Sequence, residues 1–544
     1  MTQVNVTPFE IELVDRRGRT LRADVYLPAG QPGPFPTLLA ASPYQKSLRR
    51  LPAHPAFAFV EYGPMQLYLD QGYAYVILDL PGSGRSEGSW DPVSRAEGEA
   101  IHDAIEHVAT LPWSTGRIGM IGQSYFCWSQ WNAARTRPPH LTTIVAYDGA
   151  TDMYRDWMYH GGIPMQGFLG TWLIGSVLLQ HQTEGHDIRG GERHQVMPDI
   201  LSHTMDDAWQ RDRAPLHELH RVDIPVFSIG VWGKAGLHLR GNVLGYERVA
   251  GPKKLLIAAP DSFKGAQMLY ADEQFHRDEI LPWYEHHLKG CDNGVMAMPN
   301  VRFFTQGENR YRAADNWPPA DVAASAFYLG SARSGAVRSL NDGSLLETAP
   351  HLKQDSTTWS YPDPQWTAGV TSFPDGVPDH VARVNTYTSA PFECDREFTG
   401  HGALVLHASS DQVDLDLIVK LSLLPVSGPA RKISQDWLRA SHRAEDPELT
   451  QELRPFHLHD KAVPLVPGEI VELRLELLPM SVLVRSGERI RLEVSNNDSV
   501  MADQPMTHWY GQKVGTDTYY HDQLRPSRLL LPERPRAAAA EEQS

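Results

Sequence analysis

The sequence lacks most of the features that mark secreted, membrane-bound or nucleic-acid-binding proteins. Only three of its 544 residues are cysteines, Cys127, Cys291 and Cys394, too few and too scattered for a disulfide framework or a cysteine-based zinc site. No apolar run reaches membrane-spanning length, and residues 1–6 resemble no signal peptide. The net charge of −16 argues against nucleic acid or an anionic membrane as a partner. We therefore expect a soluble, cytoplasmic protein with a small-molecule substrate and neither metal nor cofactor. The sequence leaves the oligomeric state open.

The first half of the chain alternates short apolar runs with helix-forming stretches. Such runs are typical of a parallel sheet that is buried on both faces. A hairpin opens the chain, and a helix is predicted over 100–111. The predicted strands are 11–14, 20–27, 37–41, 73–78, 117–121, 142–147, 224–231 and 254–259.

The chain is too long for one hydrophobic core, and the pattern changes twice along it. Between 151 and 221 it is rich in Trp, Met, His and helix formers, which predicts either a helical cap that shapes the substrate pocket or an ordinary helical subdomain. After 318 turn-forming residues recur about every ten positions, which indicates a β-sandwich or jelly roll. The predicted units are an α/β domain over 1–150 and 222–318, a cap over 151–221, an all-β domain over 319–535 and a frayed tail over 536–544.

Gly122-Gln123-Ser124-Tyr125 stands between an apolar run and a helix-permissive stretch, Phe126 to Ala134. A serine on a sharp strand-to-helix turn projects its hydroxyl above the sheet, with backbone N–H groups facing any oxyanion that forms. Phe126 replaces the second glycine of the usual G-x-S-x-G pattern, so the motif is incomplete. The context nevertheless predicts a nucleophile elbow.

Two further segments support the elbow. Ser42-Pro43-Tyr44 follows a predicted strand, where an α/β-hydrolase has an oxyanion-hole loop, and a tyrosine hydroxyl can donate to an oxyanion. The alternative is a turn with a buried tyrosine. The glycine-rich stretch 79–88 follows the next strand but precedes no phosphate-binding helix, so we interpret it as structural.

With these residues the chain resembles the CocE/NonD hydrolases, relatives of cocaine esterase and X-Pro dipeptidyl-peptidase. The resemblance spans nearly the whole chain and implies an α/β-hydrolase fold with a helical cap and a C-terminal jelly roll. It implies that Ser124 is the acylated nucleophile, and that Tyr44 and the Tyr125 backbone amide form the oxyanion hole. The matching segments are 42–44, 79–88, 112–113, 119–125, 130–131, 286–290, 316–318, 414–416, 438–441 and 526–532.

The chain departs from the family pattern at the other two catalytic positions. The acid of the family follows the strand 224–231 in a G-x-x-D pattern, where this chain has Gly233. The histidine of the family follows the strand 254–259, where this chain has Phe263, and no histidine occurs between Leu255 and Phe275. An unassisted serine hydroxyl is a poor nucleophile at neutral pH. A substitute base is therefore needed for acyl transfer.

Three histidines are candidates for that base. His238 lies in the loop after the strand that normally carries the acid, and it either reaches the pocket or bonds within its own loop. His276, on a predicted helix over 272–280, and His160, in the cap, are weaker candidates. For the acid, Asp148 and Asp152 follow the strand 142–147, and each could equally cap the first helix of the lid.

Two functions are therefore open. The first is a serine hydrolase that cleaves an ester or amide of a small molecule through an acyl-enzyme on Ser124, with His238 as its base. The Trp- and Met-rich lid favours an apolar or aromatic substrate. The second is a hydrolase-fold enzyme that has lost the triad and catalyses cyclisation, C–C bond formation or decarboxylation. A pure binding role would appear as ligand affinity without turnover.

Overall fold

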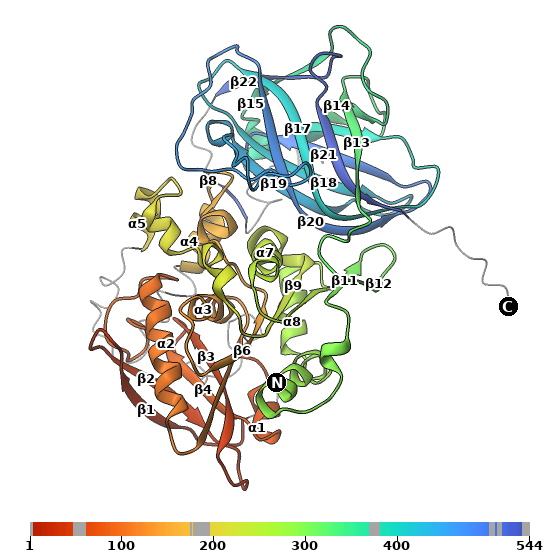
Figure 1. The fold of residues 1–544 in the computed structure, drawn as a ribbon. Helices are drawn as coiled ribbons and strands as arrows, with labels where there is room; N and C mark the ends of the chain where they lie inside the picture. Colours follow the sequence, from red (N-terminus) through yellow and green to blue (C-terminus); the bar gives the residue numbers. More distant parts are fainter. Residues whose placement is uncertain are drawn as a thin grey trace, which may run out of the picture.

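The computed structural model describes residues 4–46, 61–173, 177, 196–368, 381–499, 506–508 and 514–535. Within these ranges two large sheets follow one another along the chain, each with its own apolar core. Figure 1 shows the all-β part stacked above the α/β part. This order agrees with the predicted fold class. The predicted tail, 536–544, lies outside the described residues.

The N-terminal sheet has the strand order β1-β2-β4-β3-β5-β6-β9-β10-β11-β12 in the described part of the chain. The expected hairpin, β1 and β2, opens it, and neighbouring strands from β4 to β11 are parallel. Strands β4 and β9 are buried at every position, as a sheet covered on both faces requires. The strands are β1 (Phe9–Val14), β2 (Thr20–Tyr26), β3 (Phe35–Ser42), β4 (Ala74–Asp79), β5 (Ser114–Met120), β6 (Leu141–Tyr147), β9 (Val226–Val231), β10 (Lys253–Ala258), β11 (Val301–Thr305) and β12 (Arg310–Ala314).

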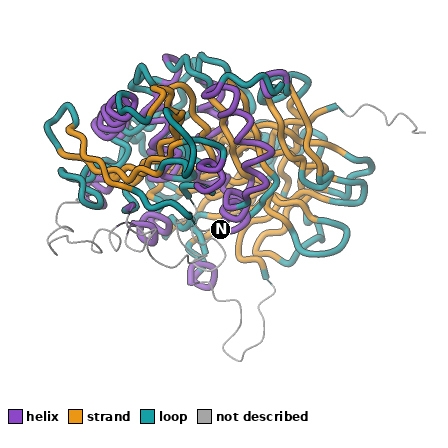
Figure 2. Tube along the Cα trace, turned by 90° about the horizontal axis from the view of Figure 1, so that it is seen from below, coloured by secondary structure: helices purple, strands orange, loops and turns teal. Residues whose placement is uncertain are grey.

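Helices connect these strands and lie against them, as the view from below shows (Figure 2). The helix predicted from Ala100 begins five residues earlier, because the Ser94 side chain accepts the Glu97 backbone N–H and caps it. No helix in the described ranges is both long and apolar enough to cross a bilayer. The helices are α1 (Met65–Asp70), α2 (Arg95–Ala109), α3 (Tyr125–Ala134), α7 (Arg240–Arg248), α8 (Phe263–Ala271), α9 (Glu273–Phe275) and α10 (Leu281–Lys289).

The segment between β6 and β9, predicted as a helical cap over 151–221, lies partly outside the described residues. Its described part contains short helices and a two-stranded hairpin. In Figure 1 α4 and α5 lie beside the junction of the α/β and all-β parts. The elements are the π-helical turn η3 (Tyr154–Met158), β7 (Tyr159–His160), β8 (Ile163–Pro164), α4 (Gln166–Trp172), α5 (Val196–Ser202), α6 (Ala208–Asp212) and the 3-10 turns η7 (Pro215–His217) and η8 (Leu219–Arg221).

The C-terminal part is built from β-strands around one apolar core. Neighbouring strands are antiparallel except β14 and β16. Further described elements are the π-helical turn η11 (His276–Ile280), the 3-10 turns η12 (Val295–Ala297) and η13 (Ala440–His442), and the helix α11 (Pro364–Ala368). The strands are β13 (Ala323–Gly330), β14 (Ser339–Leu346), β15 (Ser356–Tyr361), β16 (Ala382–Ser389), β17 (Arg396–Ser410), β18 (Asp416–Leu424), β19 (Arg431–Arg439), β20 (Val471–Val484), β21 (Arg489–Ser495), β22 (Gly515–Tyr520) and β23 (Arg528–Arg534).

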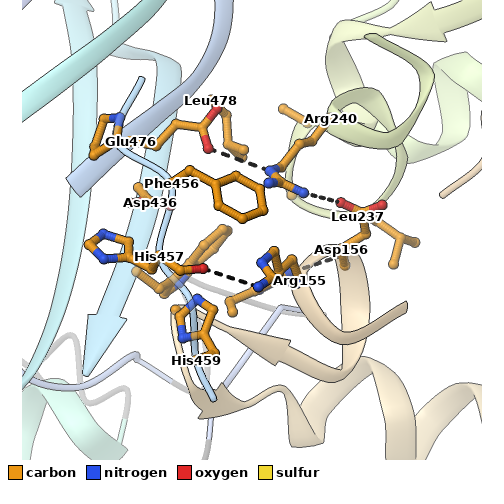
Figure 3. A pocket seen from close by; sticks show the side chains of 16 residues that line it. Arg155, Asp156, Leu237, Arg240, Asp436, Phe456, His457, His459, Glu476 and Leu478 are labelled. Atoms are coloured by element: carbon orange, nitrogen blue, oxygen red, sulfur yellow. Dashed lines mark hydrogen bonds and ion pairs between the residues drawn. The ribbon is translucent and has the colours of Figure 1, made fainter. Parts of the chain in front are cut away.

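A buried ionic network joins the two parts (Figure 3). Arg155, on η3, pairs with Asp152 and Asp206, both at 2.9 Å, and its Nη2 donates to the His457 carbonyl oxygen of the all-β part at 3.0 Å. Arg240 bridges Asp156 at 3.0 Å and Glu476, on β20, at 3.5 Å. Because removing one partner of a buried ion pair leaves an uncompensated charge, the network favours one arrangement of the two parts.

Replacing Arg155 by methionine should lower the free energy of unfolding by about 3–5 kcal/mol, because Asp152 would remain buried without its ion-pair partner and Asp206 would keep only the exposed Arg211 at 3.6 Å. Denaturant unfolding followed by tryptophan fluorescence measures the loss in the first transition. The matched control is Arg17→Met, because the half-exposed Arg17 pairs with Glu99 at 3.2 Å and should contribute less than about 1 kcal/mol. Equal losses in the two variants would contradict a stabilising role for the network.

Candidate active site

Ser124 occupies a strained turn between β5 and α3. Its backbone has φ 60° and ψ −119°, a conformation that a non-glycine residue adopts only under constraint. A glycine is required at position 122, two residues before Ser124. Its φ is 135°, and a Cβ there would overlap the Cβ of Phe126. The helix begins at Tyr125, so that Ser124 immediately precedes its first turn. This local geometry is that of a nucleophile elbow.

The two donors that the resemblance implies for an oxyanion hole lie next to the elbow, and the Tyr44 ring packs on the rings of Tyr125 and Phe126 with ring centres 6.2 and 6.1 Å apart. The Tyr44 hydroxyl accepts a 2.8 Å hydrogen bond from Trp172 Nε1, which leaves its own proton to donate. Burial, and then the neighbouring Glu61, raise the pKa of Tyr44 well above its ordinary value, so the hydroxyl stays protonated. The Tyr125 backbone N–H lies at the start of α3, where the first N–H groups of a helix have no partner within the helix.

Asp148 directly follows β6 and is fully buried beside the elbow. Its carbonyl oxygen accepts the Ser124 backbone N–H at 3.0 Å, and its carboxylate accepts a 2.9 Å hydrogen bond from Gln123 Nε2. Lys234 Nζ lies 3.4 Å from the same carboxylate. Burial alone would raise the pKa of Asp148, but Lys234 and His238 outweigh it and hold the pKa below its ordinary value. The residue is therefore a carboxylate.

His238 lies on the π-helical turn η10 (Ala235–Leu239), which follows β9 and the 3-10 turn η9 (Trp232–Lys234). Its Nδ1 donates to Asp148 Oδ1 at 3.0 Å, and its ring packs edge-on against Trp128, four residues beyond Ser124. Burial lowers the pKa of His238 more than Asp148 raises it, so the imidazole is neutral at pH 7. Two residues that the sequence analysis selected separately, Asp148 and His238, thus lie in direct contact.

The second ring nitrogen of His238 lacks a hydrogen-bond partner in the described part of the chain. Nε2 is buried and makes no hydrogen bond to any residue that the structure describes. A hydrogen bond between His238 Nε2 and Ser124 Oγ is therefore not formed in this conformation. With its proton on Nδ1, the neutral ring presents the Nε2 lone pair as a base.

Gly233 and Phe263, the positions at which the resemblance implies an acid and a histidine, make contacts of another kind. Gly233 packs so closely on the loop after β10 that a Cβ would overlap the backbone nitrogen of Ser262. Phe263 begins α8, and Lys234 Nζ lies 4.1 Å from the centre of its ring. Phe263 thus makes a cation–π contact with Lys234, the residue that follows Gly233.

The other candidate residues have structural partners. His276 is buried, with the Tyr68 hydroxyl 2.7 Å from Nδ1 and the Tyr270 carbonyl oxygen 2.8 Å from Nε2. His160 bonds His508 and the Asp156 carbonyl oxygen at the junction with the all-β part, away from the elbow. Asp152 accepts the Arg155 backbone N–H at 3.2 Å, as a helix cap does. Of the candidate acids, only Asp148 contacts the elbow.

Three residues around Ser124 were not identified from the sequence: Glu61, Trp172 and Lys234. Lys234 directly follows Gly233, where the resemblance implies an acid. A lysine beside a buried strand end could have suggested a buried ion pair. Nothing near Glu61 or Trp172 in the sequence points to the elbow, because their contacts are made across the fold. No cluster of three His, Cys, Asp or Glu suited to a metal ion occurs among the described residues.

Comparison with known proteins places this geometry in a family. Residues 17–260 match the model of the X-Pro dipeptidyl-peptidase (S15 family), and residues 293–530 match that of the X-Pro dipeptidyl-peptidase C-terminal non-catalytic domain. A putative serine esterase of Mycobacterium bovis is 25% identical, over 95% of this chain and 94% of its own length. The cocaine esterase of a Rhodococcus species is 26% identical, over 89% of each chain.

Solved structures of other proteins have the same fold. A CocE/NonD family hydrolase from Staphylococcus aureus superimposes with a TM-score of 0.81 at 24% identity, over 97% of this chain and 93% of the other. An α-amino acid ester hydrolase gives a TM-score of 0.71 at 19% identity, over 97% of both chains. The predicted fold class, an α/β-hydrolase domain followed by a β-rich C-terminal domain, is confirmed. The two family models together span most of the chain, and with these relatives they support a hydrolase of the CocE/NonD family.

Proposed function

We propose that this enzyme hydrolyses an ester or amide of a small molecule through an acyl-enzyme on Ser124, with His238 as general base and Asp148 as the residue that orients it. The observation that carries the proposal is the 3.0 Å hydrogen bond between His238 Nδ1 and Asp148 Oδ1, directly beside the elbow. The curated relatives, which include serine and cocaine esterases, support a serine hydrolase of ester or amide bonds.

The reaction would follow the usual course of a serine hydrolase. His238 Nε2 takes the proton of Ser124 as the hydroxyl oxygen attacks the carbonyl carbon, and the imidazolium is stabilised by Asp148. The Tyr44 hydroxyl and the Tyr125 N–H donate to the oxyanion. His238 then gives the proton to the leaving group, and a water molecule, activated by the same nitrogen, releases the acid. Catalytic hydrogen bonds are often long before substrate binds. The absence of a hydrogen bond between His238 Nε2 and Ser124 Oγ in this conformation is therefore compatible with the mechanism.

A cluster of aromatic side chains beside the elbow favours an apolar or aromatic acyl or leaving group. Trp172, on α4, stacks on Tyr125 with ring centres 6.1 Å apart, and it packs edge-on against Trp157 at 5.3 Å. Trp157 in turn stacks on Trp128 at 5.1 Å. Aromatic side chains of this kind line small-molecule sites and supply most of the buried contact area. The proposed substrate class rests on this cluster.

The second candidate is a non-hydrolytic enzyme on the same scaffold. It is favoured by one observation, the absence of a hydrogen bond between His238 Nε2 and any described residue, Ser124 included. In such an enzyme His238 would abstract a proton from the substrate itself, and Tyr44 would stabilise an enolate or alkoxide. Product formation by Ser124→Ala would favour this candidate.

Labelling with a fluorophosphonate tests the nucleophile and its base together. We expect the wild type to be labelled, Ser124→Ala not to be labelled, and His238→Ala to react at least about 100-fold more slowly, because general-base assistance contributes that much or more. Asp148→Asn should also slow labelling. The rates are measured by gel fluorescence over time.

The control for labelling is His140→Ala, because His140 is a surface residue paired with Glu106. It should react at the wild-type rate. Circular dichroism establishes that each variant is folded. A folded wild type that resists the probe would contradict the acyl-enzyme mechanism and favour the non-hydrolytic candidate.

The close packing of Gly233 predicts that the usual acid position cannot be restored. Gly233→Ala should destabilise the protein by about 1–3 kcal/mol, because the new Cβ meets the Ser262 backbone rather than a side chain that can rotate away. Gly170→Ala is the matched control: Gly170 lies within α4 with open space around it, and the change should be neutral or stabilise by up to about 1 kcal/mol. Thermal unfolding of both variants measures the difference, and a neutral Gly233→Ala would contradict the expectation.

Lys234 should set the pH range of activity. Its ammonium disfavours the imidazolium form of His238 and so lowers the pKa of that histidine. A general base works only when neutral, so kcat/KM falls as the pH drops through the pKa of His238. In Lys234→Met that pKa rises, and the acidic limb of the kcat/KM profile should move to higher pH. Lys264→Met, an exposed lysine on α8, should leave the profile unchanged. An unmoved limb in Lys234→Met would count against His238 as the base.

A further inference from the structure

Glu61 presents a buried carboxyl group beside the elbow that none of the roles above uses. Its carbonyl oxygen accepts the Gln123 backbone N–H at 2.8 Å, which fixes Glu61 next to the residue that precedes the nucleophile. The residue is only 5% exposed. Its Oε2 is fully buried and has no hydrogen-bond partner among the described residues. A buried carboxyl oxygen without a partner is costly, so its presence here calls for a ligand group that satisfies it.

Three ionisable residues from three different elements surround this carboxyl group. Tyr44 follows β3, Asp148 follows β6 and Lys234 ends η9, and each interacts electrostatically with Glu61. The ammonium of Lys234 is paired with Asp148 at 3.4 Å. Burial, opposed by Lys234 and assisted by Asp148, raises the pKa of Glu61 to about 8. Glu61 is therefore a neutral carboxylic acid at pH 7, and it offers an O–H donor.

We propose that Glu61 is a substrate-contacting residue that donates a hydrogen bond from its carboxylic acid to an acceptor oxygen of the substrate, close to the carbonyl group that Ser124 attacks. The inference rests on the proposed hydrolase function and adds a substrate class to it: esters or amides whose acyl part carries an ether, hydroxyl or carbonyl oxygen near the scissile bond. A cationic substrate group is disfavoured at this position, because the Lys234 ammonium lies beside it.

A pair of isosteric esters isolates this contact. p-Nitrophenyl methoxyacetate and p-nitrophenyl butyrate differ only in an ether oxygen that replaces a methylene group. The ratio of kcat/KM for the methoxyacetate to kcat/KM for the butyrate therefore reports the interaction with that oxygen. Because both esters use the same nucleophile and base, the ionisation of His238 cancels from the ratio. The contribution of Glu61 is read from how the ratio changes between variants, not from its absolute value.

Glu61→Met should lower the ratio about 3- to 10-fold, which is the effect of losing one hydrogen bond. Glu61→Gln, which is neutral and keeps an N–H donor, should keep the ratio within about twofold. In the wild type the ratio should fall as the pH rises through about 8, because the ionised carboxylate no longer donates. In Glu61→Gln it should not change with pH. The wild-type pH dependence keeps the test decisive even if Glu61→Met does not fold.

The outcomes separate the inference from the proposed function. Suppose that hydrolysis of both esters depends on Ser124, but the ratio is the same in Glu61→Met as in the wild type and does not change with pH. This result overturns the inference alone. Failure of Ser124→Ala to reduce hydrolysis, or absence of turnover of both esters by the folded wild type, overturns the proposed function and the inference with it. Ester turnover that requires Ser124, together with a ratio that depends on Glu61, supports both.

Discussion

The arrangement around the nucleophile depends on Asp148. Its carbonyl oxygen holds the Ser124 backbone N–H, and its carboxylate receives Gln123, His238 and Lys234. A fully buried carboxylate would be costly by itself, and these three partners together offset its desolvation. The consequence is mutual: the charge of Asp148 fixes the tautomer of His238 and keeps Lys234 inside the protein, while both keep Asp148 ionised. Removal of any member therefore changes the electrostatics of all the others.

The all-β part of the molecule contributes directly to this arrangement. The turn η10, which carries His238, packs against β19, and a Cβ at Gly236 would overlap the Gln435 side chain. Arg240, just after the turn, is bonded to Glu476 on β20. The base is thus held from one side by the α/β-hydrolase core and from the other by the C-terminal sheet. This explains why the ionic network at the junction lies so close to the candidate catalytic residues.

Much of the scaffold could be predicted from the sequence because its determinants are local. Each run that becomes a strand of the parallel sheet is short, apolar and bounded by turn residues, and the elbow is marked by Gly122 and Ser124 within three positions. The start of α2 was missed because it depends on a single side-chain cap, that of Ser94.

The site was predicted only in part, for a physical reason. The predictions of Asp148 and His238 rest on their positions after strands that carry the acid in α/β-hydrolases. Glu61 and Trp172 do not follow such strands, and their proximity to Ser124 arises from loops and the cap packing across the sheet. Their separation along the chain is large, so neither spacing nor periodicity carries information about them. The same applies to the contact of Lys234 with Phe263.

The proposed acid and base follow two strands that are hydrogen-bonded neighbours, β6 and β9, and the Asp148 backbone N–H donates to the Ile229 carbonyl oxygen at 2.7 Å. The pair is therefore tied together by one strand pairing and does not require the last strand of the parallel series or the loop after it. The glycine at 233 and the phenylalanine at 263 are thus no proof of an inactive enzyme.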